Sequence, residues 1–432
     1  MHDVLDPRDL VPDEAEQLLH SGYPAGGLLA QARSAAAADE YPTLEQLSRQ
    51  LTALTVGTEW GYDEPDASEV LSQTLPSLAP MPVDRTTLEN RVAGAWLGRC
   101  VANTMGKPVE GLTSEEVRIY LTAVRQWPQT GYLPLLESLP TGVSHLHESA
   151  PFACLGRFAD VPRDDDLDWT ILGLAMLEEF GQDLTTEDIA RTWLDRLPFT
   201  QTFTAERAVY RNLVRGVSPM EAATTNNPYR EWIGALIRAD IFGLVHPGQP
   251  ARACKLALVD ARLSHTGNGL YGELWAAALV SAALASNDAR QALGASLGAV
   301  PSRSRLGEAL RSVLAIHDHG GSVEEAYAWV DEHLGHYNWV HTINNAALIC
   351  IGLLWGSDFT TSVALTIAGG RDTDSSAAAV GSVYGAIHGA SAIPPALVSE
   401  THIRVRSSVR DFDRVPISEL AQRTVALIGR FA

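Results

Sequence analysis

The chain has 432 residues, 46% of them hydrophobic, so it is long enough to bury a large core in one or more domains. Its 52 acidic residues outnumber its 32 lysines and arginines, and the net charge of -20 opposes binding along a nucleic-acid backbone. We therefore expect no nucleic-acid partner. A metal ion or a local arginine can still make one pocket of an acidic protein suitable for an anionic nucleotide.

The N-terminal segment and the cysteines indicate a cytoplasmic protein. The first residues are acidic and lack the basic start and apolar run of a signal peptide, and no uncharged stretch is long enough to span a membrane. We therefore expect no membrane partner. The four cysteines lie far apart without a C-x-x-C pair, which favours buried, reduced thiols over disulfides or metal ligands: Cys100, Cys154, Cys254 and Cys350.

Residues 1–80 differ from the rest of the chain and predict a small helical N-terminal extension with a linker. Apolar residues recur at helical spacing near residues 13–20 and 44–54, within an otherwise acidic segment. A run that contains several Pro and Ser residues follows at 68–84, and we expect this run to be a linker. The second predicted domain covers residues 81–432.

From Thr86 the sequence is rich in alanine and predicts helices almost to its end. Clear helical patterns cover residues 188–197, 205–214, 251–263 and 270–285. Alternation with a period of two is nearly absent, so we predict an all-α fold, a compact multi-helix bundle. The segment from Gly131 to Arg163 has Gly, Pro and His residues without periodicity, and we expect a long loop that rims the active site.

Four carboxylates within five residues stand at the predicted start of a helix: Asp164, Asp165, Asp166 and Asp168. A single aspartate is enough to cap a helix. Neighbouring carboxylates repel one another by about 1 kcal/mol at 4 Å in water and by roughly 4 kcal/mol at an effective dielectric of 20. Burying the cluster therefore requires a compensating cation, although a plain helix cap remains the alternative.

A second acidic motif covers residues 369–376 (GGRDTDSS) and precedes a helix of small residues. Asp372 and Asp374, with hydroxyl groups beside them, offer the hard oxygen ligands that suit Mg²⁺, Mn²⁺ or Ca²⁺. Zinc is less favoured because no His or Cys accompanies either cluster. If the bundle brings the two helix starts face to face, they can hold two ions roughly 3.5 to 4 Å apart. An elaborate cap is again the alternative.

Three separated motifs resemble the ADP-ribosylglycohydrolase family, which includes dinitrogenase reductase-activating glycohydrolase and the ADP-ribosyl-acceptor hydrolases. The motifs lie at residues 91–111, 164–166 and 369–375, and their order and spacing match over residues 86–432. The resemblance implies an all-α domain with a central metal cleft that holds two Mg²⁺ ions, with Mn²⁺ as another possible metal. It also implies hydrolysis of the ribosyl bond of an ADP-ribose-like small molecule or an ADP-ribosylated protein, releasing ADP-ribose.

The resemblance assigns roles to individual residues. The implied metal ligands are Asp164, Asp165, Asp166, Asp372, Asp374 and Ser375. The catalytic candidates are Glu110, Asp165 and Asp166. The substrate-binding candidates are Asn103, Gly234, Arg238, His265, Asn268, Gly370, Arg371 and Thr373. For Glu110 a solvated loop carboxylate remains open, and for His265 a buried structural histidine.

Three positions depart from the family pattern. Asn103 stands where Asp is usual, Asp164 where Thr or Ser is usual, and Arg371 where Gly is usual. These departures indicate a divergent branch of the family. Two other functions therefore stay open: an N-glycoside hydrolase of a small nucleoside or nucleotide, and a catalytically impaired protein that binds ADP-ribose.

Overall fold

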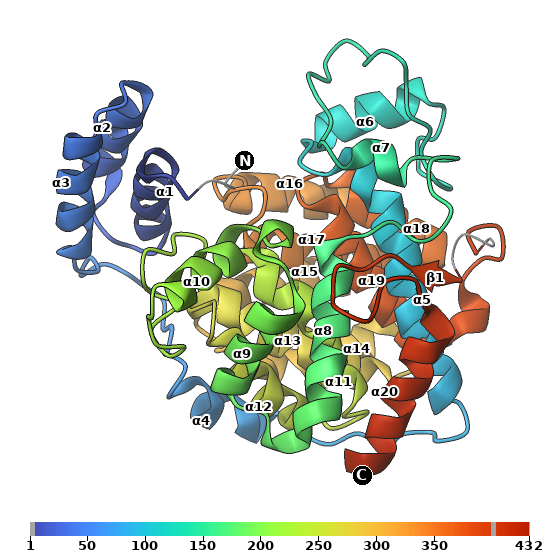
Figure 1. Ribbon diagram of the computed structural model, residues 1–432. Coiled ribbons are helices and arrows are strands. Elements are labelled where there is room, and N and C mark those ends of the chain that lie inside the picture. The colour runs from blue at the N-terminus through green and yellow to red at the C-terminus, as the bar shows by residue number, and fades with distance from the viewer. Residues whose placement is uncertain (1–4, 399–402, 432) are drawn as a thin grey trace.

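The computed structural model describes residues 5–398 and 403–431, which form two groups of helices of unequal size (Figure 1). In this part of the chain the strands are limited to one antiparallel pair, β1 (Arg404–Val405) and β2 (Val415–Pro416). The prediction of an all-α fold is confirmed. None of the described helices is both long and apolar enough to cross a membrane.

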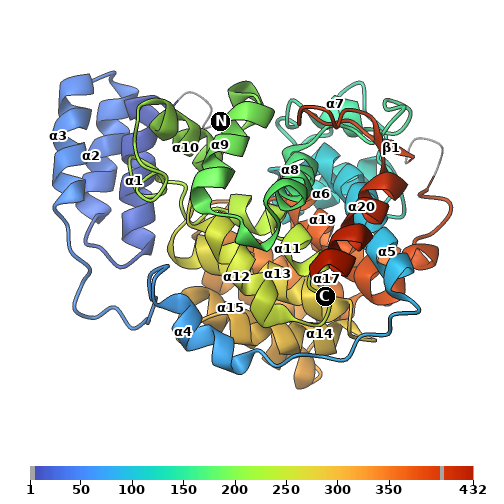
Figure 2. The same cartoon turned by 60° about the horizontal axis from the view of Figure 1, so that its bottom comes forward.

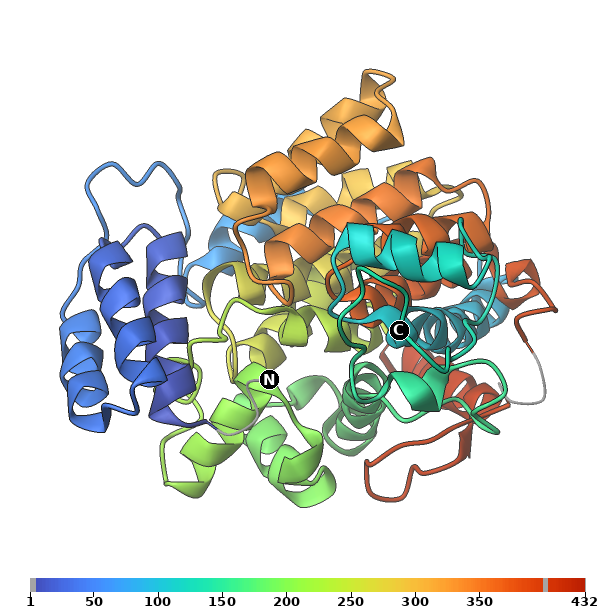
Figure 3. The same ribbon diagram turned by 90° about the horizontal axis from the view of Figure 1, so that it is seen from above.

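The smaller group contains the first three helices, α1 (Pro7–His20), α2 (Gly26–Ala37) and α3 (Tyr41–Thr52). These helices stand beside the main body in Figures 1 and 3 and pack around a small apolar core of their own, which includes Leu18, Leu29 and Leu44. Both helical patterns expected in this segment are present, within α1 and α3.

Residues 68–84 are not simply a linker. They contain α4 (Val70–Thr74) and the 3₁₀ turn η1 (Leu75–Ser77), and the side chains of Val70 and Leu78 are buried in the core of the larger group. After this segment the chain runs along the lower edge of Figure 2 toward the next long helix. The linker prediction is therefore wrong for residues 70–78, because these two apolar side chains anchor the segment.

The larger group contains all the remaining helices of the described residues. They are α5 (Leu88–Gly106), α6 (Ser114–Ala123), α7 (Ala150–Ala153), α8 (Asp165–Phe180), α9 (Thr186–Arg196), α10 (Thr204–Val214), α11 (Asp240–Leu244), α12 (Pro250–Ala261), α13 (Gly267–Ala283), α14 (Ala289–Ser296), α15 (Arg305–Asp318), α16 (Val323–Leu334), α17 (Thr342–Trp355), α18 (Phe359–Ala368), α19 (Thr373–His388) and α20 (Ile417–Phe431). The four helical patterns predicted after residue 180 fall on α9, α10, α12 and α13. The four cysteines are buried and free, as expected.

Polar contacts attach the N-terminal helices to the larger group. Gln17 Nε2 donates to Glu231 Oε2 at 2.8 Å, and Glu14 Oε2 lies 2.6 Å from Arg230 Nη1. Arg305 Nη1 donates to the carbonyl oxygen of His20 at 2.9 Å. Glu231 is almost fully buried, and its charge is balanced by Arg305, whose Nη2 lies 2.8 Å from Glu231 Oε1.

Helices α5 and α19 run antiparallel with their backbones in direct contact. Gly94 and Gly98 of α5 face Gly385 and Gly381 of α19, and a Cβ atom added at any of the four would collide with the opposite backbone. The contact places the C-terminal end of α5 against the N-terminal end of α19, where Thr373 Oγ1 donates to the carbonyl oxygen of Gly106 at 2.8 Å. Residues that follow α5 therefore lie beside residues that begin α19.

We expect Gly98→Ala to lower the free energy of unfolding by about 1 to 3 kcal/mol, because the added methyl group forces the two helices apart. Gly429→Ala is the control: this glycine lies on α20 with open space around it, so the change should be neutral or stabilise by up to about 1 kcal/mol. Urea denaturation of both variants measures the difference. Equal stability of the two variants would contradict the tight packing.

Candidate metal centre and active site

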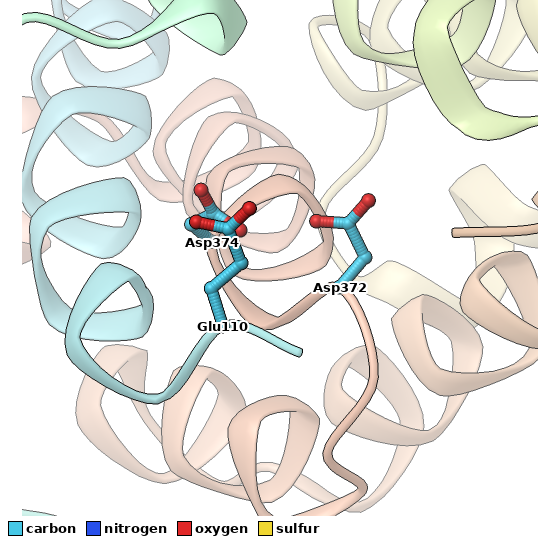
Figure 4. A group of neighbouring side chains, drawn as sticks. All are labelled: Glu110, Asp372 and Asp374. Carbon is cyan, nitrogen blue, oxygen red and sulfur yellow. The ribbon is translucent and has the colours of Figure 1, made fainter. Parts of the chain in front are cut away.

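Carboxylates from three distant segments meet at one buried point. Glu110 follows the 3₁₀ turn η2 (Lys107–Val109) at the end of α5, while the other carboxylates come from the starts of α8 and α19. Two sets of carboxylate oxygens each lie within 4.8 Å of one another: Glu110, Asp372 and Asp374, and Asp164, Asp166 and Asp374. Figure 4 shows the first set, with its side chains directed into the same space. Asp374 belongs to both sets.

The ammonium group of Lys107 lies in the middle of these carboxylates. Its Nζ atom is 2.8 Å from Glu110 Oε2 and 2.7 Å from both Asp164 Oδ2 and Asp374 Oδ2. Burial alone would lower the pKa of this lysine, but the surrounding carboxylates outweigh it and raise the pKa well above its usual value. Lys107 therefore stays charged and links the two carboxylate sets.

Sequence reasoning gave Lys107 no role, although it stands within one of the three motifs. The signal that could have found it is its rarity, because Lys107 and Lys255 are the two lysines of the whole chain. Only the folded chain shows that its ammonium group meets Asp164, 57 residues further along, and Asp374, 267 residues further along.

One ammonium does not balance the cluster. Burial favours the neutral acids, yet Lys107 holds the pKa of Glu110 and Asp164 below their usual values. Burial and neighbouring carboxylates raise the pKa of the other carboxyls, to about 7 for Asp165, to about 6 for Asp374 and well above the ordinary value for Asp166 and Asp372. The cluster therefore takes up protons or a further cation.

The chemistry of the cluster fits a hard divalent cation. Asp166 Oδ1 and Asp374 Oδ1 are buried and have no hydrogen-bond partner among the described residues. Such atoms are costly to bury unless something binds them. All the atoms of this cluster that could bind a metal ion are oxygens, which Mg²⁺ and Mn²⁺ prefer as ligands. Ser375, also predicted as a ligand, lines the same cavity, whereas Asp165 belongs to neither set.

Asn103 and Asp168 each have a clear contact in this region. Asn103 Nδ2 donates to Asp166 Oδ2 at 2.9 Å, so the amide supports a carboxylate where the family usually adds another acid. Asp168 accepts from Arg163 Nε at 2.8 Å and from Ser407 Oγ at 2.6 Å. Asp168 therefore fastens the start of α8 to the segment around β1 and lies outside both carboxylate sets.

Three predicted substrate-binding residues, Gly370, Arg371 and Thr373, shape the turn before α19. Gly370 and Arg371 have φ angles of 66° and 69°, and a Cβ on Gly370 would meet the backbone at residues 112–114. The Arg371 guanidinium lies 2.7 Å from Asp331. None of these three residues lines the cavity that contains Asp372 and Asp374. Their contact with substrate stays a prediction.

Arg238 and His265 lie behind the cavity wall, in a second buried ionic cluster. Arg238 is 2% exposed, lies 2.5 Å from Glu206 and also pairs with Asp260. Burial and the nearby Arg238 lower the pKa of His265 well below its usual value, so this histidine is neutral. These contacts fit a structural role, and a role in substrate binding stays a prediction.

Gly234 and Asn268 occupy different positions. Gly234 lines the cavity itself, and a Cβ there would collide with the Glu206 carboxylate. Asn268 is fully buried, and its side chain donates to Glu64 at 2.8 Å and to Glu231 at 3.0 Å. The absence of a side chain at Gly234 therefore makes room for the Glu206 carboxylate, and contact of Gly234 with substrate stays a prediction. Asn268 helps to hold the N-terminal segment.

Two adjoining cavities surround the carboxylates. The first, which we call the metal cavity, has a volume of about 470 Å³, contains Glu110, Asp372 and Asp374, and has walls from Trp232 and Trp339. The second has a volume of about 980 Å³ and is lined by several arginines, so we call it the arginine cavity. The loop predicted at residues 131–163 lines both cavities, as expected.

Within that loop, His147 contacts Glu110, a pairing that the sequence did not indicate. Its Nδ1 atom lies 3.1 Å from Glu110 Oε2 and 2.6 Å from Ser149 Oγ. Burial would lower the pKa of His147, but Glu110 outweighs it and raises this pKa. The loop thus places an imidazole next to the cluster, where Glu110 favours its protonated form.

Comparison with known proteins decides the family. Residues 84–430 match the family model described as ADP-ribosylglycohydrolase. The chain belongs to the ADP-ribosylglycohydrolase family. The match confirms the resemblance that the motifs indicated. Members of this family are metal-dependent glycohydrolases that act on ADP-ribosylated substrates.

Two individual proteins are also similar to this chain. An uncharacterised protein of Archaeoglobus fulgidus is 26% identical over 306 residues, which cover 69% of this chain and 88% of that protein. A solved structure, described as an ADP-ribosylglycohydrolase-related protein complex, covers 80% of this chain and 99% of its own, with 20% identity and a TM-score of 0.46.

We expect Lys107→Met to lower the free energy of unfolding in EDTA by about 3 kcal/mol, because it leaves buried carboxylates without their cation. Saturating Mn²⁺ should stabilise this variant more than the unmodified protein, since the ion replaces the lost charge. Thermal unfolding with and without Mn²⁺ measures both effects. Lys255→Met, at an exposed site, is the control, and equal behaviour of the two variants would contradict the role of Lys107.

Proposed function

We propose that this protein hydrolyses the ribosyl glycosidic bond of an ADP-ribosylated substrate and releases ADP-ribose, using two divalent cations, in the cytoplasm. The observation that carries the proposal is the convergence of carboxylates from Glu110 and from the starts of α8 and α19 at one cavity. Mg²⁺ is the expected metal and Mn²⁺ the alternative, because every available ligand atom is a hard oxygen.

The two carboxylate sets suggest how the ions would be divided. Glu110, Asp372 and Asp374 would hold one ion, and Asp164, Asp166 and Asp374 the other, with Asp374 as the shared ligand. Bound cations of this kind make a water molecule acidic and orient oxygen atoms of a substrate. Lys107 contacts both sets, so it would tune the charge of the centre.

Asp165 is the best candidate for a general acid. It lies outside both carboxylate sets, is half-buried and lines both the metal cavity and the arginine cavity. A carboxyl in this place can give its proton to the leaving atom while the ribosyl group occupies the metal cavity. Glu110, in contact with His147, is positioned to accept a proton from the attacking water.

The direct test is incubation of the protein and Mg²⁺ or Mn²⁺ with ADP-ribosylarginine and with ADP-ribosylserine peptides, followed by chromatography for free ADP-ribose. We expect metal-dependent release that EDTA abolishes. Absence of release from every acceptor would refute this substrate assignment. A parallel panel of nucleosides and nucleotides tests an N-glycoside hydrolase, and calorimetry with ADP-ribose tests a protein that binds without turnover.

We expect Asp165→Asn to reduce kcat by about 100-fold to 10,000-fold while Mn²⁺ affinity stays near that of the unmodified protein, as for a lost general acid. Asp374→Asn should instead weaken Mn²⁺ binding strongly, because Asp374 belongs to both carboxylate sets. Calorimetry with Mn²⁺ and initial-rate measurements separate the two effects. If Asp165→Asn loses metal affinity as Asp374→Asn does, Asp165 is a ligand and not the acid.

A further inference from the structure

The arginine cavity adjoins the metal cavity and differs from it in charge. The two cavities share Lys107, His147, Glu148, Asp165 and Phe203. The cations that line the arginine cavity are Lys107, Arg157, Arg163, Arg207, Arg406 and Arg414. They outnumber its carboxylates, which are Glu148, Asp160, Asp164 and Asp165. Three of these cations, Lys107, Arg163 and Arg406, also pair with acids outside this lining, so a place for an anion must be sought at the remaining arginines.

Most of these arginines are already held by acids. Arg163 lies 2.8 Å from Asp168. The two cavity-lining arginines of the β1–β2 segment also have carboxylate partners, Arg406 at 2.7 Å and Arg414 at 2.8 Å. These ion pairs keep the guanidinium groups in place around the cavity. They also leave few donors free for a ligand.

Arg157 differs from these three arginines. Its side chain is exposed, lines the arginine cavity and makes no hydrogen bond or ion pair with any residue that the structure describes. A guanidinium group binds carboxylate or phosphate oxygens through two parallel hydrogen bonds. Arg157 is therefore available to receive an anionic group from a ligand.

Aromatic side chains form the apolar part of the same cavity. Phe152 is 69% exposed and Phe199 is 46% exposed, and both line the arginine cavity. The Arg207 guanidinium lies 5.4 Å from the centre of the Phe199 ring and 5.3 Å from that of the Phe203 ring. A planar or apolar group that carries a negative charge would find both of its partners here.

The positions of the acids distinguish the two ends of a substrate. The first carboxylate set, Glu110, Asp372 and Asp374, lines the metal cavity and not the arginine cavity, whereas Asp164 of the second set lines the arginine cavity. Ribosyl oxygens held at the first set would therefore lie in the metal cavity. Asp165 stands where the two cavities meet. A proton donor at this junction lies between the ribosyl group and whatever occupies the arginine cavity.

We infer that the arginine cavity binds the leaving group of the glycosidic substrate, and that this group carries a carboxylate or phosphate on a planar or apolar body. The inference rests on the proposed function for the identity of the other half of the substrate. Arg157 receives the anionic oxygens, and Phe152 and Phe199 cover the apolar body.

The first experiment needs no turnover. Phenyl phosphate is titrated into the full chain in EDTA and followed by calorimetry, with phenol as the uncharged probe. We expect phenyl phosphate to bind and phenol to bind at least about tenfold more weakly. Arg157→Glu should weaken the binding of phenyl phosphate about tenfold or more, because it removes one charge-assisted contact. Arg215→Glu is the matched control, since Arg215 is an exposed arginine outside the cavity.

The outcomes separate this inference from the proposed function. Binding that Arg157→Glu leaves intact overturns the anion site. Displacement of phenyl phosphate by ADP-ribose, together with weaker ADP-ribose binding in Arg157→Glu, overturns the leaving-group assignment, because the cavity would then hold the diphosphate. Binding that depends on Arg157 without hydrolysis of any ADP-riboside supports the anion site and refutes only the proposed function.

The second experiment uses two synthetic substrates, the phenyl and the 4-carboxyphenyl ADP-ribosides. We expect the unmodified protein and Arg215→Glu to prefer the carboxylated substrate by about tenfold in kcat/KM, and Arg157→Glu to bring this ratio to about one or below. A ratio near one in the unmodified protein overturns the preference for an anionic leaving group.

Discussion

The site depends on the backbone contact between α5 and α19. Gly94 and Gly98 of α5 contact Gly385 and Gly381 of α19. Because glycine has no side chain, the two helices approach more closely than larger residues at these positions would allow. This contact sets the distance between the residues that follow α5 and the residues that begin α19. Since Lys107 and Asp374 stand at these two ends, their ion pair follows from the packing of the helices.

Electrostatic balance is the second constraint on the centre. The start of α8 brings carboxylates close to those of α19, while Lys107 supplies a single positive charge. Without a metal ion, burial is the main cause that raises the pKa of Asp165 to about 7 and that of Asp374 to about 6. Protonation of these carboxyls then reduces the repulsion. A divalent cation achieves the same result without protons, so metal uptake and proton release are linked in one equilibrium.

The sequence predicted the parts of this site that are local and missed those that depend on packing. The aspartate motifs are recognisable because like charges are crowded together at helix starts, and their convergence was a reasonable expectation for a helical bundle. The place of Lys107 depends on which helices touch, and nothing in its neighbours shows that.

Segments outside the centre follow the same rule. Residues 68–84 have the local composition of a linker, yet Val70 and Leu78 find a hydrophobic surface far away in the chain. Arg238 pairs with Glu206 and Asp260 inside the protein, partners that the sequence around Arg238 does not indicate, while its role in substrate binding stays a prediction. Helices were predictable from periodicity, whereas long-range partners of polar and isolated apolar side chains were not.

The attachment of the N-terminal helices has a consequence for how this enzyme can be trimmed. The match to the family begins at residue 84, so a shortened version that starts there would look complete by sequence. It would, however, strip Gln17 from Glu231 and Glu14 from Arg230, next to Trp232 in the wall of the metal cavity. The N-terminal helices thus contact residues directly beside the wall of the metal cavity, so their removal would change the surroundings of that wall.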